Sequence, residues 1–342
     1  MQDIKELTLN ELEGVLRKAG KPAFHARQIF SWIYKREALD FLDMSDLPIE
    51  LRRRLREDFF ILGLKIGKAL ESRDGTKKFL LLTKDKNFIE AVSIPQEKRI
   101  TGCISSQVGC KFKCSFCASG LSGFKRNLTS QEMLDELLYL KNNTLNKKLT
   151  HIVCMGTGEP LDNYDSVLKT IRIINSPDTF NIGARRLTIS TCGIIPGIKR
   201  LAKEKLQVEL SVSLHAADNK TRSRIMPVNK AYPLLTLIDA CRNYIEETGR
   251  QITFEYVLIK GINSDLQSAQ NLVKILKGLN CKVNLIPVNT VKEFNFSPPG
   301  KIEILFFKNY LLKAGLNITL RKPRGQDIEA ACGQLKFGYE KK

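Results

Sequence analysis

Three cysteines within eight residues are the feature of this 342-residue chain with the clearest chemistry. Cys110, Cys114 and Cys117 lie in the run G-C-K-F-K-C-S-F-C-A-S-G, a C-x₃-C-x₂-C spacing. Such a loop can supply three thiolates to a [4Fe–4S] cluster, which normally takes four cysteine ligands. The spacing therefore predicts a cluster with one iron left open to a small molecule, as a catalyst requires and an electron carrier does not.

A disulfide framework or a zinc site would fit these cysteines less well. Disulfide frameworks are typical of short secreted chains, whereas this chain is long and has an odd number of cysteines, nine. A zinc site usually brings a fourth Cys or His at short range. The histidines, His25, His151 and His215, all lie far from the motif in the sequence. Three soft thiolates without a nearby fourth ligand favour iron and sulfide.

The charge of the chain favours a polyanionic partner. The formal net charge is +19, and residues 1–90 hold 18 Lys and Arg against 15 Asp and Glu. Residues 91–342 hold 37 against 21, so the excess accompanies the cysteine motif. Ordinary solubility charge is the alternative, but a surplus of this size favours binding to nucleic acid.

The sequence predicts a cytoplasmic protein. It contains no apolar run of the roughly 18 residues that a membrane-spanning helix needs. Its first residues, M-Q-D-I-K-E-L, lack the basic start and apolar stretch of a secretory signal. A reducing compartment also suits exposed thiolates and an oxygen-sensitive cluster.

The pattern of elements predicts three regions. Residues 1–60 have helical periodicity, beginning with a capping-box pair at Thr8 and Glu11, and form an expected accessory domain. Residues 61–95 contain short strands separated by turns at Asp74 and Asp85, and form an expected β extension. Residues 96–342 form the expected core domain.

In the core region, strands and helices alternate after the cysteine loop, which indicates an α/β fold with a parallel sheet and right-handed crossovers. About six such units favour a partial (β/α)₆ barrel with its chemistry at the carboxyl ends of the strands. A doubly wound sheet is the alternative, and periodicity alone does not separate the two.

Several polar residues and a glycine fall where the expected strands end. They are Gly158, Glu159, Ser190, Ser213, His215 and Asn289. Each alone could be a turn former or a buried polar group that is already hydrogen-bonded. Together at one rim of the sheet they predict a ligand pocket, in which glycine allows close backbone approach and a carboxylate could accept from an ammonium group.

Longer motifs resemble a known family. The C-x₃-C-x₂-C run resembles the radical S-adenosylmethionine (SAM) superfamily. The stretches C-I-S-S-Q-V-G-C, M-G-T-G-E-P-L, S-T-C-G-I-I-P-G-I, S-V-S-L-H-A, N-L-I-P-V-N and R-G-Q-D-I-E-A-A-C-G-Q-L resemble the RlmN family of radical SAM methyltransferases. The similarity runs from the N-terminal helices almost to the last residue.

The resemblance assigns roles to individual positions. It implies that Cys110, Cys114 and Cys117 hold the cluster, that Cys332 carries the methyl group, that Cys103 is its partner thiol and that Glu90 is the proton acceptor. The residues that it implies contact SAM are Gly158, Glu159, Ser190, Ser213, Leu214, His215 and Asn289. It gives no role to Cys154, Cys192, Cys241 and Cys281, which we expect to be small buried side chains.

The implied reaction is methylation of C2 of adenosine in 23S ribosomal RNA and in transfer RNA. C2 lies between two ring nitrogens and is too electron-poor to attack a sulfonium methyl group, but a carbon radical can add to it. In the implied sequence, Cys332 is first methylated and then joined to the base through its methylene group. A base removes the C2 proton, and Cys103 attacks the sulfur of Cys332 to free the product as a disulfide forms.

The resemblance also implies partners and alternatives. The expected partners are 23S rRNA, tRNA and an electron donor such as flavodoxin or ferredoxin, and the expected state is a monomer. Arg52, Arg53, Arg54 and Arg56 could contact phosphates or form a solvated helix face. A Cfr-type enzyme, which methylates C8 of the same ribosomal adenosine, is the second hypothesis, and a non-catalytic iron–sulfur RNA-binding protein is the third. The G-E-P-L and H-A-R-Q-I-F-S-W-I-Y segments favour C2.

Overall fold

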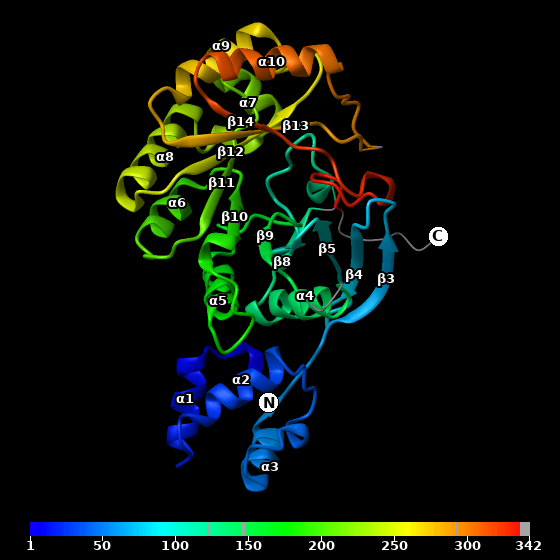
Figure 1. Cartoon of the computed structure of the whole chain (residues 1–342), viewed down its shortest axis with the longest axis vertical. Coiled ribbons are helices and arrows are strands. Elements are labelled where there is room, and N and C mark those ends of the chain that lie inside the picture. The colour runs from blue at the N-terminus through cyan, green and yellow to red at the C-terminus, as the bar shows by residue number, and fades with distance from the viewer. Residues whose placement is uncertain (122, 145–147, 292, 336–342) are drawn as a thin grey trace.

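The computed structural model describes residues 1–121, 123–144, 148–291 and 293–335. Its N-terminal part is a group of three helices, α1 (Leu9–Lys18), α2 (His25–Tyr34) and α3 (Ile49–Asp58), which lie apart from the large sheet (Figure 1). Two short strands, β1 (Gln2–Asp3) and β2 (Phe59–Phe60), pair in parallel and close this group. The predicted capping box at the start of α1 is present, because Thr8 and Glu11 exchange hydrogen bonds.

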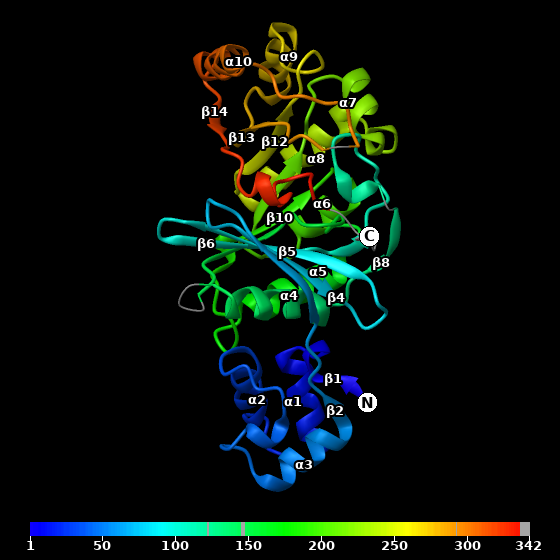
Figure 2. The same ribbon diagram turned by 90° about the vertical axis from the view of Figure 1, so that its right-hand side faces the viewer.

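The rest of the chain is built on one ten-stranded sheet. Its antiparallel part consists of β3 (Lys65–Glu71), β4 (Lys77–Leu82), β5 (Phe88–Gln96) and β6 (Arg99–Cys103). Its parallel part continues from β6 with β9 (His151–Cys154), β10 (Leu187–Thr191), β11 (Glu209–Ser213), β12 (Ile252–Leu258), β13 (Cys281–Pro287) and β14 (Asn317–Leu320). The antiparallel strands therefore extend the same sheet that carries the parallel strands (Figure 2).

Helices connect the parallel strands. The crossovers contain α4 (Ser130–Asn142), α5 (Tyr164–Asn175), α6 (Ile195–Ala202), α7 (Asn219–Ile225) with α8 (Leu234–Thr248), α9 (Leu266–Leu276) and α10 (Lys301–Lys313). Short 3₁₀ helices lie at Ile4–Glu6, Phe41–Asp43, Ala118–Gly120, Ala184–Arg186, Pro227–Lys230 and Gln326–Ile328. A separate hairpin, β7 (Gln107–Gly109) with β8 (Phe124–Asn127), brackets the cysteine loop.

The strand order separates the two fold hypotheses. The parallel strands follow one another in the order β6, β9, β10, β11, β12, β13 and β14. A doubly wound sheet would reverse direction at a switch point, and this order does not. Six strand–helix units and an open sheet with edges at β14 and β3 make an α/β partial barrel, as the sequence predicted.

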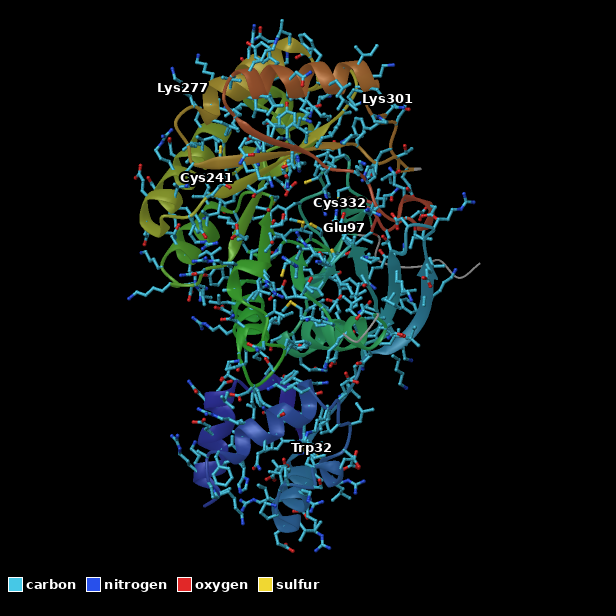
Figure 3. All side chains as sticks on the ribbon, viewed as in Figure 1. Trp32, Glu97, Cys241, Lys277, Lys301 and Cys332 are labelled. Carbon is cyan, nitrogen blue, oxygen red and sulfur yellow. The ribbon has the colours of Figure 1, made fainter. Side chains whose placement is uncertain are left out.

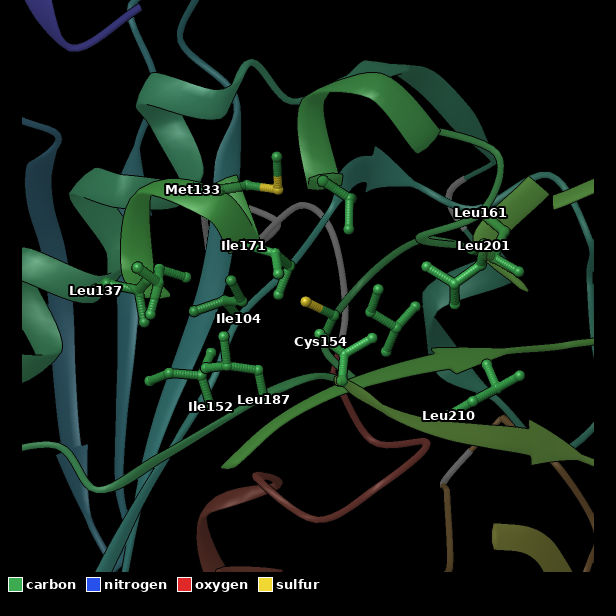
Figure 4. Close-up of a cluster of buried hydrophobic side chains, with 14 of the residues drawn as sticks. Ile104, Met133, Leu137, Ile152, Cys154, Leu161, Ile171, Leu187, Leu201 and Leu210 are labelled. Atoms are coloured by element: carbon green, nitrogen blue, oxygen red, sulfur yellow. The ribbon is translucent and has the colours of Figure 1, made fainter. Parts of the chain in front are cut away.

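The core lies between the sheet and the helices that cover it. Ile152, Leu187 and Leu210 project from three adjacent strands toward Met133, Leu137, Ile171 and Leu201 of the covering helices (Figure 4). These side chains are at most 3% exposed, and burial of each contributes about 1.5–3 kcal/mol. Because this layer fixes the strands from outside, their carboxyl ends are held in place for a site.

A buried ion pair attaches the N-terminal helices to the core. The ammonium of Lys5 lies 2.5 Å from a carboxylate oxygen of Asp135 on α4, and the two side chains are 1% and 3% exposed. Lys5 also contacts Asp3 at 3.6 Å and donates to the carbonyl of Leu62. Burial raises the pKa of Asp135 to about 7, against the lowering effect of the Lys5 charge.

Replacing Lys5 by methionine should destabilise the protein, because the carboxylate of Asp135 would stay buried without its cation. We expect a loss of about 3 kcal/mol in the free energy of unfolding, measured with urea. The double variant Lys5→Met/Asp135→Leu should recover part of that loss, because Asp3 still lacks the Lys5 cation but keeps its two backbone donors. The exposed pair of Arg17 and Glu13 gives the control, because Arg17→Met should change stability by less than about 0.5 kcal/mol. Equal losses in the two single variants would contradict the prediction.

Among the residues that the structure describes, no helix is both long and apolar enough to cross a membrane.

Candidate active site

The carboxyl ends of the parallel strands open into one cavity of about 1010 Å³, counted with its open mouth. Its wall contains most of the residues that the sequence singled out. They are Cys110, Cys114, Cys117, Gly158, Glu159, Ser190, Ser213, His215, Asn289 and Cys332. The barrel thus brings residues more than two hundred positions apart to one place.

Backbone hydrogen bonds fix the loop that carries the three cysteines. The N–H of Cys110 donates to the carbonyl of Gly123 at 2.9 Å, and the N–H of Ser115 donates to the carbonyl of Ile225 at 2.9 Å. The ring of Phe116 packs edge-on against the imidazole of His215, with ring centres 4.8 Å apart. The loop is therefore held against both the β7–β8 hairpin and the barrel.

The chemistry of the three thiols fits an iron–sulfur cluster. Burial raises the pKa of Cys110 to about 12 and raises the pKa values of Cys114 and Cys117 as well. The charge of Cys117 contributes to the raised pKa values of both Cys110 and Cys114, so the thiolates repel one another in this pocket. Three partly buried thiolates need positive charge among them, which the iron atoms of a cluster would supply.

A single metal ion would need a different arrangement. Among the described residues, no group of three or more His, Cys, Asp or Glu side chains converges as the ligands of one ion do. The ligands of a four-iron cluster stand farther apart, because each thiolate binds a different iron atom. The arrangement of the three cysteines therefore favours an iron–sulfur cluster over a site for a single metal ion.

Glu159 has structural partners besides its place in the cavity wall. One carboxylate oxygen accepts from the N–H of Leu161 at 3.0 Å, and the other accepts from the N–H of Cys192 at 2.6 Å. The side chain thus ties the loop after β9 to the loop after β10. Burial raises the pKa of this carboxyl group, and the two N–H donors act against that rise. A carboxylate has about four acceptor positions, so capacity for a ligand remains.

Gly158 occupies a position that a side chain would disturb. Its φ is +109°, and an added Cβ would lie 2.6 Å from the Cβ of Gln107 and 2.8 Å from the hydroxyl of Ser106. The backbone therefore approaches the β7 segment as closely as a glycine permits.

The variant Gly158→Ala should lose about 2 kcal/mol or more in the free energy of unfolding, from the strained φ and the steric overlap. Denaturant unfolding would measure this. Gly183→Ala is the matched control, since Gly183 has φ −58° and open space around it. A Gly158→Ala variant as stable as the Gly183→Ala variant would contradict the prediction.

His215 is presented to the cavity as a neutral donor. Its Nδ1 accepts from the N–H of Val257 at 3.0 Å, so the ring proton is on Nε2. Burial, together with the charge of Arg222, lowers the pKa of the imidazole to about 3. The residue has φ +57°, in the left-handed region, which turns the chain at the end of β11. A neutral N–H donor at this position can orient a polar ligand without adding charge.

Asn289 connects the cavity to the C-terminal segment, which we define as residues 324–335. Its Nδ2 donates to the carbonyl of Cys332 at 2.9 Å, and its Oδ1 accepts from the amide of Gln326 at 2.7 Å. The N–H of Ala118, next to the cysteine loop, donates to the carbonyl of Gly333 at 2.7 Å. The exposed Cys332 is therefore held at the cavity by its own backbone (Figure 3).

A second cavity of about 580 Å³ brings Cys103 and Cys332 to one wall, together with Arg321. Cys103 is 7% exposed, and burial raises its pKa far above the usual value. The charge of Arg321 acts against that rise. Arg321 and Cys332 also line the first cavity, so Cys332 stands between the two.

Two residues implied by the resemblance, Leu214 and Glu90, line neither of these two cavities. Leu214 is fully buried, and its N–H donates to the carbonyl of Glu255 at 3.0 Å. Glu90 is 1% exposed and lines neither of the two cavities described above. Instead, its carboxylate lies 3.0 Å from the ammonium of Lys78.

Several residues at the cavity were not predicted from the sequence to belong to the site. Cys154 and Cys192, which were expected to be simple core side chains, also line the first cavity, as does Glu255. Arg222 is fully buried and donates to the carbonyls of Leu214 and Cys192 below the cavity. The position of Cys192 directly after β10 was a usable signal, because the same argument selected Ser190. No local signal distinguishes Arg222 from a surface arginine.

Family models match two parts of the chain. Residues 104–273 match the model of the radical SAM superfamily. Residues 2–61 match the model described as the N-terminal domain of the ribosomal RNA large subunit methyltransferase. The first match contains the cysteine loop and the strand ends up to β12, and the second contains helices α1, α2 and α3.

Full-length relatives and a solved structure agree with the family models. A "Probable dual-specificity RNA methyltransferase RlmN" of Thermoanaerobacter sp. (strain X514) is 45% identical over 100% of this chain and 99% of the relative. The protein with the same name from Caldanaerobacter subterraneus subsp. tengcongensis is 46% identical over the same shares. The crystal structure of a radical SAM methyltransferase from Sphaerobacter thermophilus superposes with a TM-score of 0.93 and 43% identity, over 98% of this chain and 99% of that one. This chain therefore belongs to the RlmN family of radical SAM methyltransferases.

Proposed function

We propose that this protein methylates C2 of adenosine in 23S ribosomal RNA and in transfer RNA. The relatives named above carry the RlmN name, which favours C2 over the C8 position of the Cfr-type hypothesis. The observation that carries the proposal is the position of Cys332. One cavity contains the three thiols of the cluster motif and Cys332, and the next contains Cys332 and Cys103.

The radical SAM family uses a [4Fe–4S] cluster and SAM. Cys110, Cys114 and Cys117 would hold the cluster, and Gly158, Glu159, Ser190, Ser213, Leu214, His215 and Asn289 would contact SAM. When bound, the pair supplies one-electron cleavage of SAM and a carbon-centred radical. The residues of the chain orient what enters: His215 offers a neutral N–H, and Gly158 leaves room for close backbone approach.

The remaining roles fall to Cys332, Cys103 and Glu90. Cys332 would carry the methyl group, since its sulfur is exposed between the two cavities. Cys103 would attack the sulfur of Cys332 to release the product, because the two residues share the wall of the second cavity. Glu90 would accept the C2 proton. Its burial next to Lys78 would keep its carboxylate away from water until the adenine of the RNA is bound.

We further propose how the regions of the chain divide this work. Residues 1–60 would form an accessory RNA-binding domain, residues 61–95 a β extension and residues 96–342 the catalytic core. Arg53, Arg54 and Arg56 on α3 are more than half exposed and are available to phosphates beyond their local ion pairs. Arg52 has a structural role, because its guanidinium donates to the carbonyls of Leu42 and Leu47 at 3.0 Å.

The oligomeric state, the compartment and the electron donor are also part of the proposed function. We propose a monomer that works in the cytoplasm, where both RNA substrates are made, and that receives electrons from flavodoxin or ferredoxin. All nine cysteines are free in the structure, which suits a reducing compartment.

The test is anaerobic incubation of the reconstituted protein with SAM, a reductant and either a ribosomal RNA fragment or a tRNA, followed by nucleoside analysis. We expect 2-methyladenosine with both RNAs. Appearance of 8-methyladenosine would show that the methylated position is C8 and not C2. Absence of methyladenosine from both RNAs would refute the proposal.

A further inference from the structure

A buried ion pair lies beneath the C-terminal segment. Lys78 on β4 and Glu90 on β5 are diagonal neighbours, since Lys78 pairs with Val92 and Leu80 pairs with Glu90 in the sheet register. The ammonium lies 3.0 Å from a carboxylate oxygen, and the side chains are 3% and 1% exposed. Removing two charges from water is costly, so a pair this deeply buried must be held by its surroundings.

The ammonium of Lys78 has a further partner in the C-terminal segment. It donates to the carbonyl of Glu329 at 3.0 Å, three residues before Cys332. Glu329 has φ +53°, a left-handed conformation that is uncommon for residues other than glycine. The chain thus adopts a strained conformation at the residue whose carbonyl faces the ammonium. One cation therefore contacts both the carboxylate of Glu90 and the backbone that leads to Cys332.

Other contacts fix the same segment to the turn between β3 and β4. The carboxylate of Asp327 accepts from the hydroxyl of Ser72 at 2.5 Å, and the N–H of Gly325 donates to Asp74 at 3.0 Å. The segment is thus already anchored at its start, by two carboxylates that reach solvent rather than by a buried charge. A buried charge is not needed for anchoring alone, because apolar side chains of similar volume stabilise a protein as well or better.

We propose that Lys78 is a positioning residue that holds the carboxylate of Glu90 ready as proton acceptor and aligns it with the segment that carries Cys332. This inference rests on the proposed function, and specifically on Glu90 as the acceptor of the C2 proton. A general base must be ionised and correctly placed when its substrate arrives. The ammonium favours the ionised form of the buried carboxylate. The hydrogen bond from Lys78 to the carbonyl of Glu329 fixes the position of the Glu90 carboxylate relative to Cys332, the residue that would bind the adenine.

The test compares Lys78→Met, Lys78→Arg and Lys77→Met in the full-length protein reconstituted with its cluster. Lys77 is the matched control, because it is the next residue on β4 and its pair with Glu71, at 3.5 Å, is partly exposed to solvent. Three quantities are measured: S-methylation of Cys332 by peptide mass, release of methyladenosine, and the protein–RNA adduct that survives denaturation.

We expect Lys78→Met to methylate Cys332 within about two-fold of the wild type. Its release of methyladenosine should fall about 100-fold, the size of a lost general-base contribution, and the covalent adduct should accumulate. Lys78→Arg should restore release to within about ten-fold of the wild type, and Lys77→Met should match the wild type. A role in stability alone would lower Cys332 methylation, adduct and product together.

A double variant covers the case in which Lys78→Met folds poorly. Lys78→Met/Glu90→Gln removes both charges of the pair, and its product loss can be compared with that of Glu90→Gln alone. Equal product losses in the double variant and in Glu90→Gln support the proposal, since Lys78 would then act only through Glu90. If the loss in the double variant equals the product of the losses in the two single variants, the proposal is overturned. Normal product release by Lys78→Met, or a parallel loss of all three measured quantities in that variant, would also overturn it. Wild-type protein without any methyladenosine would refute the proposed function itself, and this inference with it.

Discussion

Replacing Cys332 by alanine should abolish RNA methylation, with a loss of at least ~1,000-fold in product formation. The sulfur of Cys332 is exposed between the two cavities, and its backbone is held by Asn289 and by Ala118 beside the cysteine loop. Without that sulfur, no atom of the chain in this position can accept a methyl group and later pass it to a base. Nucleoside analysis after anaerobic turnover measures the effect.

Two further cysteine variants give this prediction its controls. Cys241 on α8 is fully buried in the core and distant from Cys332 (Figure 3), so Cys241→Ala should retain methylation. Cys103→Ala should accumulate the covalent protein–RNA adduct, because the thiol that releases it is absent; the double variant Cys103→Ala/Cys332→Ala should form none. Methyladenosine produced by Cys332→Ala would show that the methyl group takes another route.

Replacing Cys114 by alanine should remove the cluster and, with it, the cleavage of SAM. Burial and the charges of the other two thiols oppose ionisation of Cys114, so its thiolate is expected to exist only with iron bound. We expect the reconstituted variant to hold less than about a quarter of the iron and sulfide of the wild type. Chemical analysis of iron and sulfide, together with visible absorbance, measures this without any turnover.

The control for the cluster variant comes from the same cavity. Cys192 also lines the wall but lies outside the C-x₃-C-x₂-C motif. Cys192→Ala should therefore keep the iron and sulfide content of the wild type. If Cys114→Ala held a full cluster, or if Cys192→Ala lost it, the ligand set would have to be reassigned.

Local sequence signals predicted the parts of the structure that local interactions determine. The capping box at Thr8 is present, because it involves residues only three positions apart. The polar residues at the strand ends line one cavity, since all parallel strands present their carboxyl ends at one edge. Alternation of strands and helices gave the α/β class, but only the observed strand order separated a partial barrel from a doubly wound sheet.

Contacts between distant residues could not be predicted in this way. Nothing near Lys78 in the sequence indicates that its ammonium reaches Glu329, 251 residues away. Likewise, Asn289 was selected because it follows a strand, whereas its hydrogen bonds to Cys332 and Gln326 depend on the path of the C-terminal segment. Arg222 appears as one basic residue among many until its donors are seen to meet the carbonyls of two loops.

The single side-chain amide of Asn289 has a thermodynamic consequence. Its nitrogen and oxygen both engage the segment that carries Cys332, at the wall of the cavity proposed for SAM. Each atom retains one further hydrogen-bonding position, so a small molecule that binds there shares the same amide with that segment. Affinity for the cofactor and anchoring of the methyl carrier are then linked quantities, and by reciprocity whatever loosens one alters the other by the same free energy.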